Sequence, residues 1–247
     1  MFAGIDVTHH SRAHATLARF ESDRRFAWTR ENGVWTFAGL ELLADDRVAL
    51  VGESTIVAED TTDAAPVFAR VYDGSSGDLV WQRDSTSGEL QVDARHVTRT
   101  LAIGTNGDLL VRASDGGDYV VIRTDAAGNA LPDWRWTSGG DQVVAHEILA
   151  LPDGGAIVSG QRNTLGGGYA TVRFDAQGNT VFADIERGRI GNPLGPSRVR
   201  IDPNGEFIIA AAPESVFGVP LAQVWKPRTA SGCGHAACRI PMVTSHA

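Results

Sequence analysis

Short runs of apolar residues recur along the chain, separated by segments rich in Asp, Asn, Pro and Gly. Examples are AIVSG at 156–160 and FIIAAA at 207–212. Apolar, β-branched runs of this length between turn residues predict strands, and no stretch longer than about 10 residues has helical periodicity. Because these runs are continuous rather than alternating, both faces of the sheets should be covered. The pattern predicts an all-β protein.

One hairpin-like segment recurs at a regular interval. ATVRFDAQGNTVF at 170–182 is preceded by VVIRTDAAGNALPDW at 120–134, FARVYDGSSGDLVW at 68–81 and ATLARFESDRRFAW at 15–28. The spacings between the turn acids are 52, 52 and 50 residues, for Glu21, Asp73, Asp125 and Asp175. A fifth copy without its turn is GVPLAQVWK at 218–226. A fixed period of this length indicates a repeat architecture.

Each period contains four predicted strands, as in HEILALP, GAIVSGQ, GYATVRFD and NTVFADIE. Four antiparallel strands per repeat of about 50 residues are typical of a β-propeller blade. The prediction is an all-β propeller of about four to five units, incomplete or open. It divides residues 1–226 into a partial blade 1–37, blades 38–90, 91–140 and 141–190, and a partial blade 191–226, followed by an irregular tail, 227–247.

The recurring turn has a physical explanation. In D-x-x-G-N the glycine adopts a positive φ at no steric cost, and the Asp side chain accepts hydrogen bonds from backbone N–H groups two residues on. Asp73, Asp125 and Asp175 are therefore predicted to have structural roles. Aromatic residues follow the turns, and each could bury roughly 150–250 Å² between blades. They are Trp28, Trp81, Trp134 and Phe182.

VYDGSSGDLVW at 71–81 resembles the tryptophan-docking repeat of quinoprotein-type propellers, A-x-D-x-x-x-G-x-x-x-W, with Val71 in place of the Ala. The copies at Asp125 and Asp175 are one residue shorter before the Gly and resemble D-x-x-G-N repeats of bacterial secreted or surface propeller proteins. The resemblance covers residues 15–226 and implies a propeller fold and a periplasmic, secreted or cell-surface location. No cofactor is predicted.

The two ends of the repeat region differ. The N-terminal portion supplies strands two to four of a blade, and the portion ending at PLAQVW (220–225) supplies strands one to three. We therefore expect an open array, part of a larger ring, rather than one blade shared by both termini. A complete small ring with an irregular closing blade is the alternative. An incomplete array leaves an apolar blade face at each end, which favours self-association.

Composition narrows the partners. The net charge of −8 and the pI near 5.3 argue against nucleic acid or an anionic membrane as the main partner. No run approaches the ~18–20 apolar residues of a membrane span, and the N-terminus lacks the apolar region of a signal peptide. Localisation is not predicted from these features.

Candidate chemistry is sparse. Cys233, His235, Cys238 and His246 lie in the tail and could ligate zinc, but no scaffold orients them, so a local disulfide or free thiols are favoured. Near the other terminus, His9, His10 and His14 are predicted to be exposed loop residues. Each turn offers one carboxylate, too few for a calcium loop. No catalytic, cofactor-binding or metal-binding residue is predicted.

RGRIGNPLGPSR at 187–198 departs most from the repeat. Because binding residues concentrate on loops, we expect Arg187, Arg189 and Arg198 to contact a ligand, with an ordinary inter-blade connection as the alternative. The predicted function is a non-catalytic binding or scaffold module for a protein or glycan. The alternatives are a fragment of a quinoprotein-like dehydrogenase, or a truncated remnant without independent activity.

Overall fold

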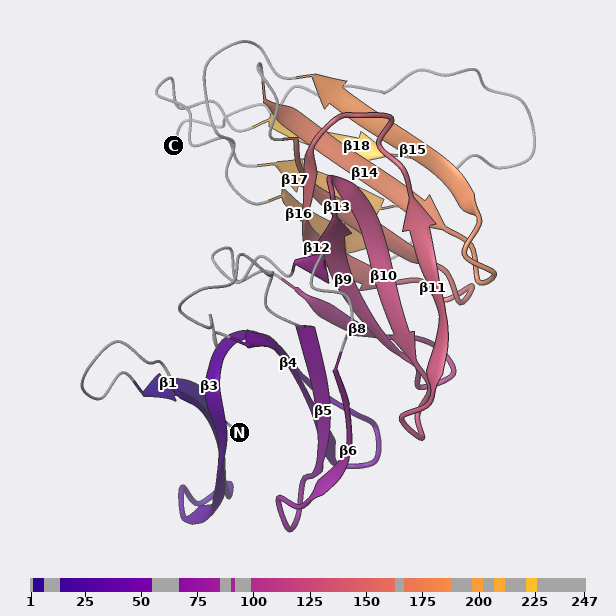
Figure 1. The fold of residues 1–247 in the computed structure, drawn as a ribbon. Helices are drawn as coiled ribbons and strands as arrows, with labels where there is room; N and C mark the ends of the chain where they lie inside the picture. Colours follow the sequence, from indigo (N-terminus) through magenta and orange to yellow (C-terminus); the bar gives the residue numbers. More distant parts are fainter. Residues whose placement is uncertain are drawn as a thin grey trace, which may run out of the picture.

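The computed structural model describes residues 2–6, 14–54, 67–84, 90–91, 99–162, 167–187, 197–201, 207–211 and 221–225. All regular secondary structure in these ranges is β-strand, 18 strands in total (Figure 1). The all-β prediction is confirmed for this part of the chain. Within the same ranges there is no helix that could cross a membrane.

The first six strands form one antiparallel sheet in sequence order. They are β1 (Phe2–Asp6), β2 (His14–Phe20), β3 (Phe26–Leu42), β4 (Arg47–Ser54), β5 (Val67–Asp73) and β6 (Leu79–Asp84). The long strand β3 belongs to two units, because it pairs with β2 up to Val34 and with β4 from Trp35 onward. We call β1, β2 and the first part of β3 unit I, and the second part of β3 with β4, β5 and β6 unit II.

Three further sheets follow. Unit III contains β7 (Leu90–Gln91), β8 (Leu101–Ile103), β9 (Leu109–Asp115), β10 (Asp118–Thr124) and β11 (Ala130–Trp136), with β7 and β8 both paired to β9. Unit IV contains β12 (Val143–Ala150), β13 (Ala156–Arg162), β14 (Gly168–Phe174) and β15 (Thr180–Arg187), in that order. Unit V contains β16 (Ser197–Ile201), β17 (Phe207–Ala211) and β18 (Leu221–Trp225).

The hydrophobic core is divided into clusters, each of which joins two consecutive units. Strand β9 shows why: Val111 packs toward unit II, whereas Leu110 packs toward unit IV. Successive side chains of a strand point to opposite faces, so a continuous apolar strand fills two clusters at once. The units therefore stack face to face, and among the described strands no hydrogen-bonded ladder joins unit I to unit V, which leaves the array open.

The strand connections lie at two opposite ends of the sheets. Hairpin turns at 21–25, 74–78, 125–129 and 175–179 join the last two strands of units I to IV, and we call their end the turn face (Figure 1). Strand β15 runs from the last of these turns to Arg187 at the opposite end, where β16 begins. We call that opposite end the loop face.

Candidate functional site

The turn acids hold their own hairpins. Asp125 Oδ1 accepts hydrogen bonds from the backbone N of Ala127 and Asn129 at 2.9 and 2.8 Å, and its Oδ2 accepts one from Asn129 Nδ2 at 2.9 Å. Asp175 makes the same three contacts with the residues at the matching positions. Bonds to the asparagine side chains lower the pKa of both carboxyls. These acids act within the turn.

The turn after β5 is one residue longer and is held differently. Asp73 Oδ1 accepts hydrogen bonds from the backbone N of Ser75 and of Ser76, both at 2.9 Å, and from Ser75 Oγ at 2.5 Å. These bonds, first of all that from the Ser75 hydroxyl, lower the pKa of Asp73 to about 2. The carboxylate is therefore ionised over the physiological range.

A tryptophan of the preceding unit packs against the glycine in three of these turns. The three glycines have φ of +75°, +93° and +88°. A Cβ there would lie only 2.6, 2.7 and 2.0 Å from the indole ring: Gly77 against Trp28, Gly128 against Trp81 and Gly178 against Trp134. Glycine is required twice over, because L-residues resist this φ and because a side chain would displace the ring. Each tryptophan thus docks onto the turn of the next unit.

The three docked indoles differ in whether the N–H group has an acceptor. Trp28 Nε1 donates to the Gly74 carbonyl at 2.9 Å, and Gly74 lies in the longer turn. Over the shorter turns, Nε1 of Trp81 and of Trp134 is buried with no acceptor among the described residues. Phe182, at the same position of unit IV, packs against the cluster that unit IV shares with unit V.

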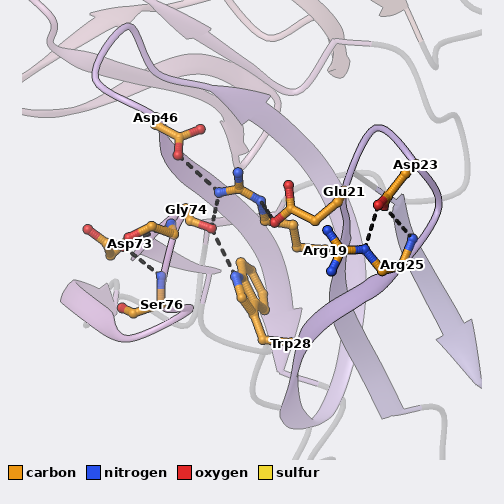
Figure 2. Close-up of polar contacts among 10 residues, drawn as sticks. Arg19, Glu21, Asp23, Arg25, Trp28, Asp46, Asp73, Gly74 and Ser76 are labelled. Carbon is orange, nitrogen blue, oxygen red and sulfur yellow. Dashed lines mark hydrogen bonds and ion pairs between the residues drawn. The ribbon is translucent and has the colours of Figure 1, made fainter.

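Figure 2 shows the polar cluster at the first of these contacts. Arg19 of unit I donates to Asp46 Oδ2 of unit II at 3.0 Å and to the Gly74 carbonyl, which also accepts from Trp28. Glu21 lies 3.7 Å from Arg19 Nε. A guanidinium offers several donors in a fixed geometry, so one arginine can hold two turns of the next unit. The cluster joins units I and II.

Arginines two residues before the turn acids make related contacts in units III and IV. Arg123 pairs with Asp108 at 3.1 Å, and its guanidinium carbon lies 4.4 Å from the Trp134 ring centroid. Arg173 pairs with Asp153 at 2.6 Å. Stacking a cation on the docked indole adds attraction to its burial. These arginines brace the turn face.

Buried polar side chains join the units deeper in the sheets. Arg112 is fully buried in unit III, donates to the Ala145 carbonyl of unit IV and lies 3.3 Å from Thr100 Oγ1. Tyr119 Oη donates to the Ala170 carbonyl at 3.0 Å, and burial raises the pKa of this phenol. A buried polar group is tolerated when it is hydrogen-bonded.

A carboxylate plays the corresponding role between units IV and V. Glu147 is buried; its Oε2 accepts from Val199 N at 2.5 Å, and its Oε1 pairs with Arg200 at 2.7 Å. Sequence reasoning missed Arg112, Tyr119 and Glu147. For Arg112 and Glu147 the available signal was a charge inside an apolar strand, in LLVRASD and in AHEILAL.

Comparison with known proteins shows which solved structures share this arrangement of sheets. The chain is similar to the Dos1 propeller at 9% identity with a TM-score of 0.51, covering 87% of this chain and 52% of that one. It is similar to the dihydro-heme d1 dehydrogenase NirN at 14% identity with a TM-score of 0.51, covering 92% of this chain and 41% of that one.

The chain folds as a β-propeller. Units I to V are its blades, and the chain spans about half the length of the two propeller chains. At these identities the likeness concerns the fold alone. No family model matches the sequence, and no curated protein matches it.

Two of the three predicted ligand-contact arginines, Arg187 and Arg198, have their backbones at the loop face of blades IV and V. Arg187 is the last residue of β15 and Arg198 the second of β16, so both backbones lie at this end of the sheets. Their side chains and Arg189 lie outside the described residues. The described strands show no group of three or more His, Cys, Asp or Glu suited to a metal. The zinc candidates Cys233, His235, Cys238 and His246 lie outside them, as do His9 and His10. The prediction of a loop at His14 is wrong, because His14 is the first residue of β2 and pairs with Asp6 of β1.

Proposed function

We propose that this propeller is a non-catalytic binding module that holds a carboxylate-bearing ligand, an acidic protein segment or an acidic glycan, at the loop face between blades IV and V. Arg187, Arg189 and Arg198 supply the contacts. The observation that carries the proposal is the placement of β15 and β16. Strand β15 ends at Arg187 and β16 begins at Ser197, both at the end opposite the docking turns.

Many of the described polar side chains have structural roles, so we look for ligand contacts among residues outside the repeat. The turn acids Asp73, Asp125 and Asp175 bond within their own turns. The buried charges Arg112 and Glu147 bond to the next blade. The connection 187–198 breaks the repeat, so its arginines are not required at every blade. Residues that depart from a repeat are the ones available for a specific ligand.

Arginine suits this task chemically. Its planar guanidinium can donate two parallel hydrogen bonds to one carboxylate, and charge-assisted bonds are about twice as strong as neutral ones. The chain has a net charge of −8, so a local group of arginines also distinguishes this end from the acidic remainder. An acidic ligand is attracted to it and repelled elsewhere.

The test compares two triple variants of the full chain. Arg187→Ala/Arg189→Ala/Arg198→Ala removes three charges at the loop face, and Arg25→Ala/Arg30→Ala/Arg47→Ala removes three at the turn face. Binding to immobilised polyglutamate and to a uronic-acid oligosaccharide is measured by surface plasmon resonance. We expect the loop-face variant to lose at least about tenfold in affinity, equivalent to about 1.4 kcal/mol, and the turn-face variant to match wild type.

The two probes distinguish the source of the carboxylate. Binding of polyglutamate alone indicates an acidic protein ligand, and binding of the oligosaccharide alone an acidic glycan. The wild-type affinity should fall as salt is raised, because the contact is between exposed charges. Wild-type binding to neither probe, or equal losses in both variants, contradicts the proposal.

A further inference from the structure

The hairpin turn of blade I has the docking-turn backbone but not the docking glycine. Glu21 N donates to Arg25 O at 2.9 Å and Arg24 N to Glu21 O at 2.9 Å. The matching bonds in blade III are Asp125 N to Asn129 O at 2.9 Å and Gly128 N to Asp125 O at 3.0 Å. Arg24 therefore occupies the glycine position, and it keeps the left-handed backbone with φ of +68°.

This substitution changes what can pack on the outward face of blade I, the face directed away from blade II. At the three other turns a Cβ would lie 2.0–2.7 Å from a docked indole. Arg24 carries such a Cβ, so a tryptophan cannot dock on this turn as it does on the others. The left-handed conformation of a non-glycine residue is also costly, which marks the position as unusual.

The outward face of blade I is nevertheless aromatic. Phe20 occupies the position held by Tyr72 in blade II and Phe174 in blade IV, which are 4% and 0% exposed. Phe174 is covered by the tryptophan of the preceding blade, with ring centroids 5.8 Å apart. Phe20 is 37% exposed and Phe26 is 58% exposed, and the two rings form an edge-to-face pair at 5.8 Å. Phe20 and Phe26 thus form a small exposed apolar patch on blade I.

The charges beside the two rings indicate that a second copy of this chain binds there. Glu21, Asp23, Arg24 and Arg25 sum to zero in a chain whose net charge is −8. Two copies of an acidic chain repel each other, and a locally neutral patch reduces this repulsion at the point of contact. Asp23 already pairs with Arg25 at 2.5 Å, and Arg24 has no ion pair among the described residues. Its guanidinium is the cation left to cross to another molecule.

We propose that this propeller forms a two-fold symmetric dimer through the outward face of blade I. The Phe20 and Phe26 rings of both copies form a shared aromatic core, and Arg24 of each copy pairs with Glu21 or Asp23 of the other. A two-fold axis applies each contact twice, so a patch carrying both rings and both charge signs is self-complementary. The contact lies at the other end of the array from the loop-face arginines and does not depend on the proposed ligand function.

Sedimentation equilibrium of the full chain from about 1 μM to about 100 μM tests the proposal. We expect wild type to reach twice its mass of 26.3 kDa and no more. Phe26→Ser and Arg24→Glu should each weaken dimerisation at least about tenfold. Leu79→Ser/Val80→Ser is the matched control, because these side chains are 48% and 47% exposed on β6 of blade II, and it should dimerise like wild type.

Reversing the charges on both sides of the contact distinguishes loss of the ion pair between copies from misfolding of a variant. Arg24→Glu should regain mixed dimers with a Glu21→Arg/Asp23→Arg partner, which a merely unfolded variant does not. Circular dichroism melts confirm that each variant is folded. Monomeric wild type at about 100 μM, growth beyond the dimer, or unchanged dimerisation of Phe26→Ser overturns the proposal. A tighter assembly in Arg24→Gly would indicate tryptophan docking and would overturn it as well.

Discussion

The glycine of the docking turn should be one of the most sensitive positions of the fold. Gly178 has φ of +88°, and a Cβ there would lie 2.0 Å from Trp134 Cδ1. Gly107 has a similar φ of +79°, but its nearest neighbour would be Ala126 Cβ at 3.6 Å, an ordinary contact. Both residues also donate a backbone hydrogen bond of 3.0 Å across a turn. Gly178→Ala and Gly107→Ala therefore share the backbone penalty and differ in the steric one.

The magnitudes follow from the structure. A left-handed alanine costs about 1–2 kcal/mol, which is the whole expected effect of Gly107→Ala. In Gly178→Ala the Trp134 ring must also move away from contact. A buried tryptophan covers about 150–250 Å², worth about 4–6 kcal/mol at about 25 cal/mol per Å². Losing about half of that burial adds about 2–3 kcal/mol. The free energy of unfolding should fall by about 3–5 kcal/mol in total.

Urea denaturation followed by circular dichroism and by tryptophan fluorescence measures these losses, and coincident transitions justify the two-state treatment. The double variant Gly178→Ala/Trp134→Ala isolates the docking contact. With the indole removed, Gly178→Ala should cost only the backbone term, which gives a coupling energy of about 2–3 kcal/mol. Equal losses in Gly178→Ala and Gly107→Ala, or a coupling energy within about 0.5 kcal/mol of zero, would refute the docking argument.

Two further predictions concern single carboxylates. The pKa of Asp73 is lowered from 3.8 to about 2, so its stabilisation is complete above about pH 4 and is lost as the pH falls through about 2. Wild type should lose melting temperature between pH 4 and 2 more steeply than Asp73→Asn, and parallel curves would contradict this. Glu147→Ala should leave Val199 N without its acceptor at a cost of about 1–3 kcal/mol, with faster hydrogen exchange at Val199 and a smaller effect in Glu147→Gln. Unchanged exchange at Val199 would count against a role for Glu147 in holding blade V.

Local hydrogen bonding explains why the hairpins could be predicted from sequence. Asp125 bonds to groups two and four residues away, so the turn is encoded in five consecutive residues. The same holds for Asp175. Strands with both faces apolar likewise predicted sheets stacked face to face, which the core clusters show. Neither pattern required knowledge of a distant residue.

Contacts between blades could not be derived in this way. Trp28 lies 46 residues from the carbonyl that it donates to, and Glu147 lies 52 residues from Val199. A repeat of about 50 residues is compatible with an indole packing on either neighbouring blade. Only the folded chain shows that each tryptophan docks on the turn that follows it. The consequence of Arg24 was hidden for the same reason, since a turn without glycine is informative only once the ring on the other turns has been located.

The amino-acid sequence alone determined the period, the strands and the turns of this propeller, because each depends on neighbours within a few residues. Tertiary structure decided which polar side chains bond between neighbouring blades and which aromatic rings remain exposed. Burial is a property of the stacked blades, so a charge such as Arg112 inside an apolar strand acquires its role only when the next blade covers it.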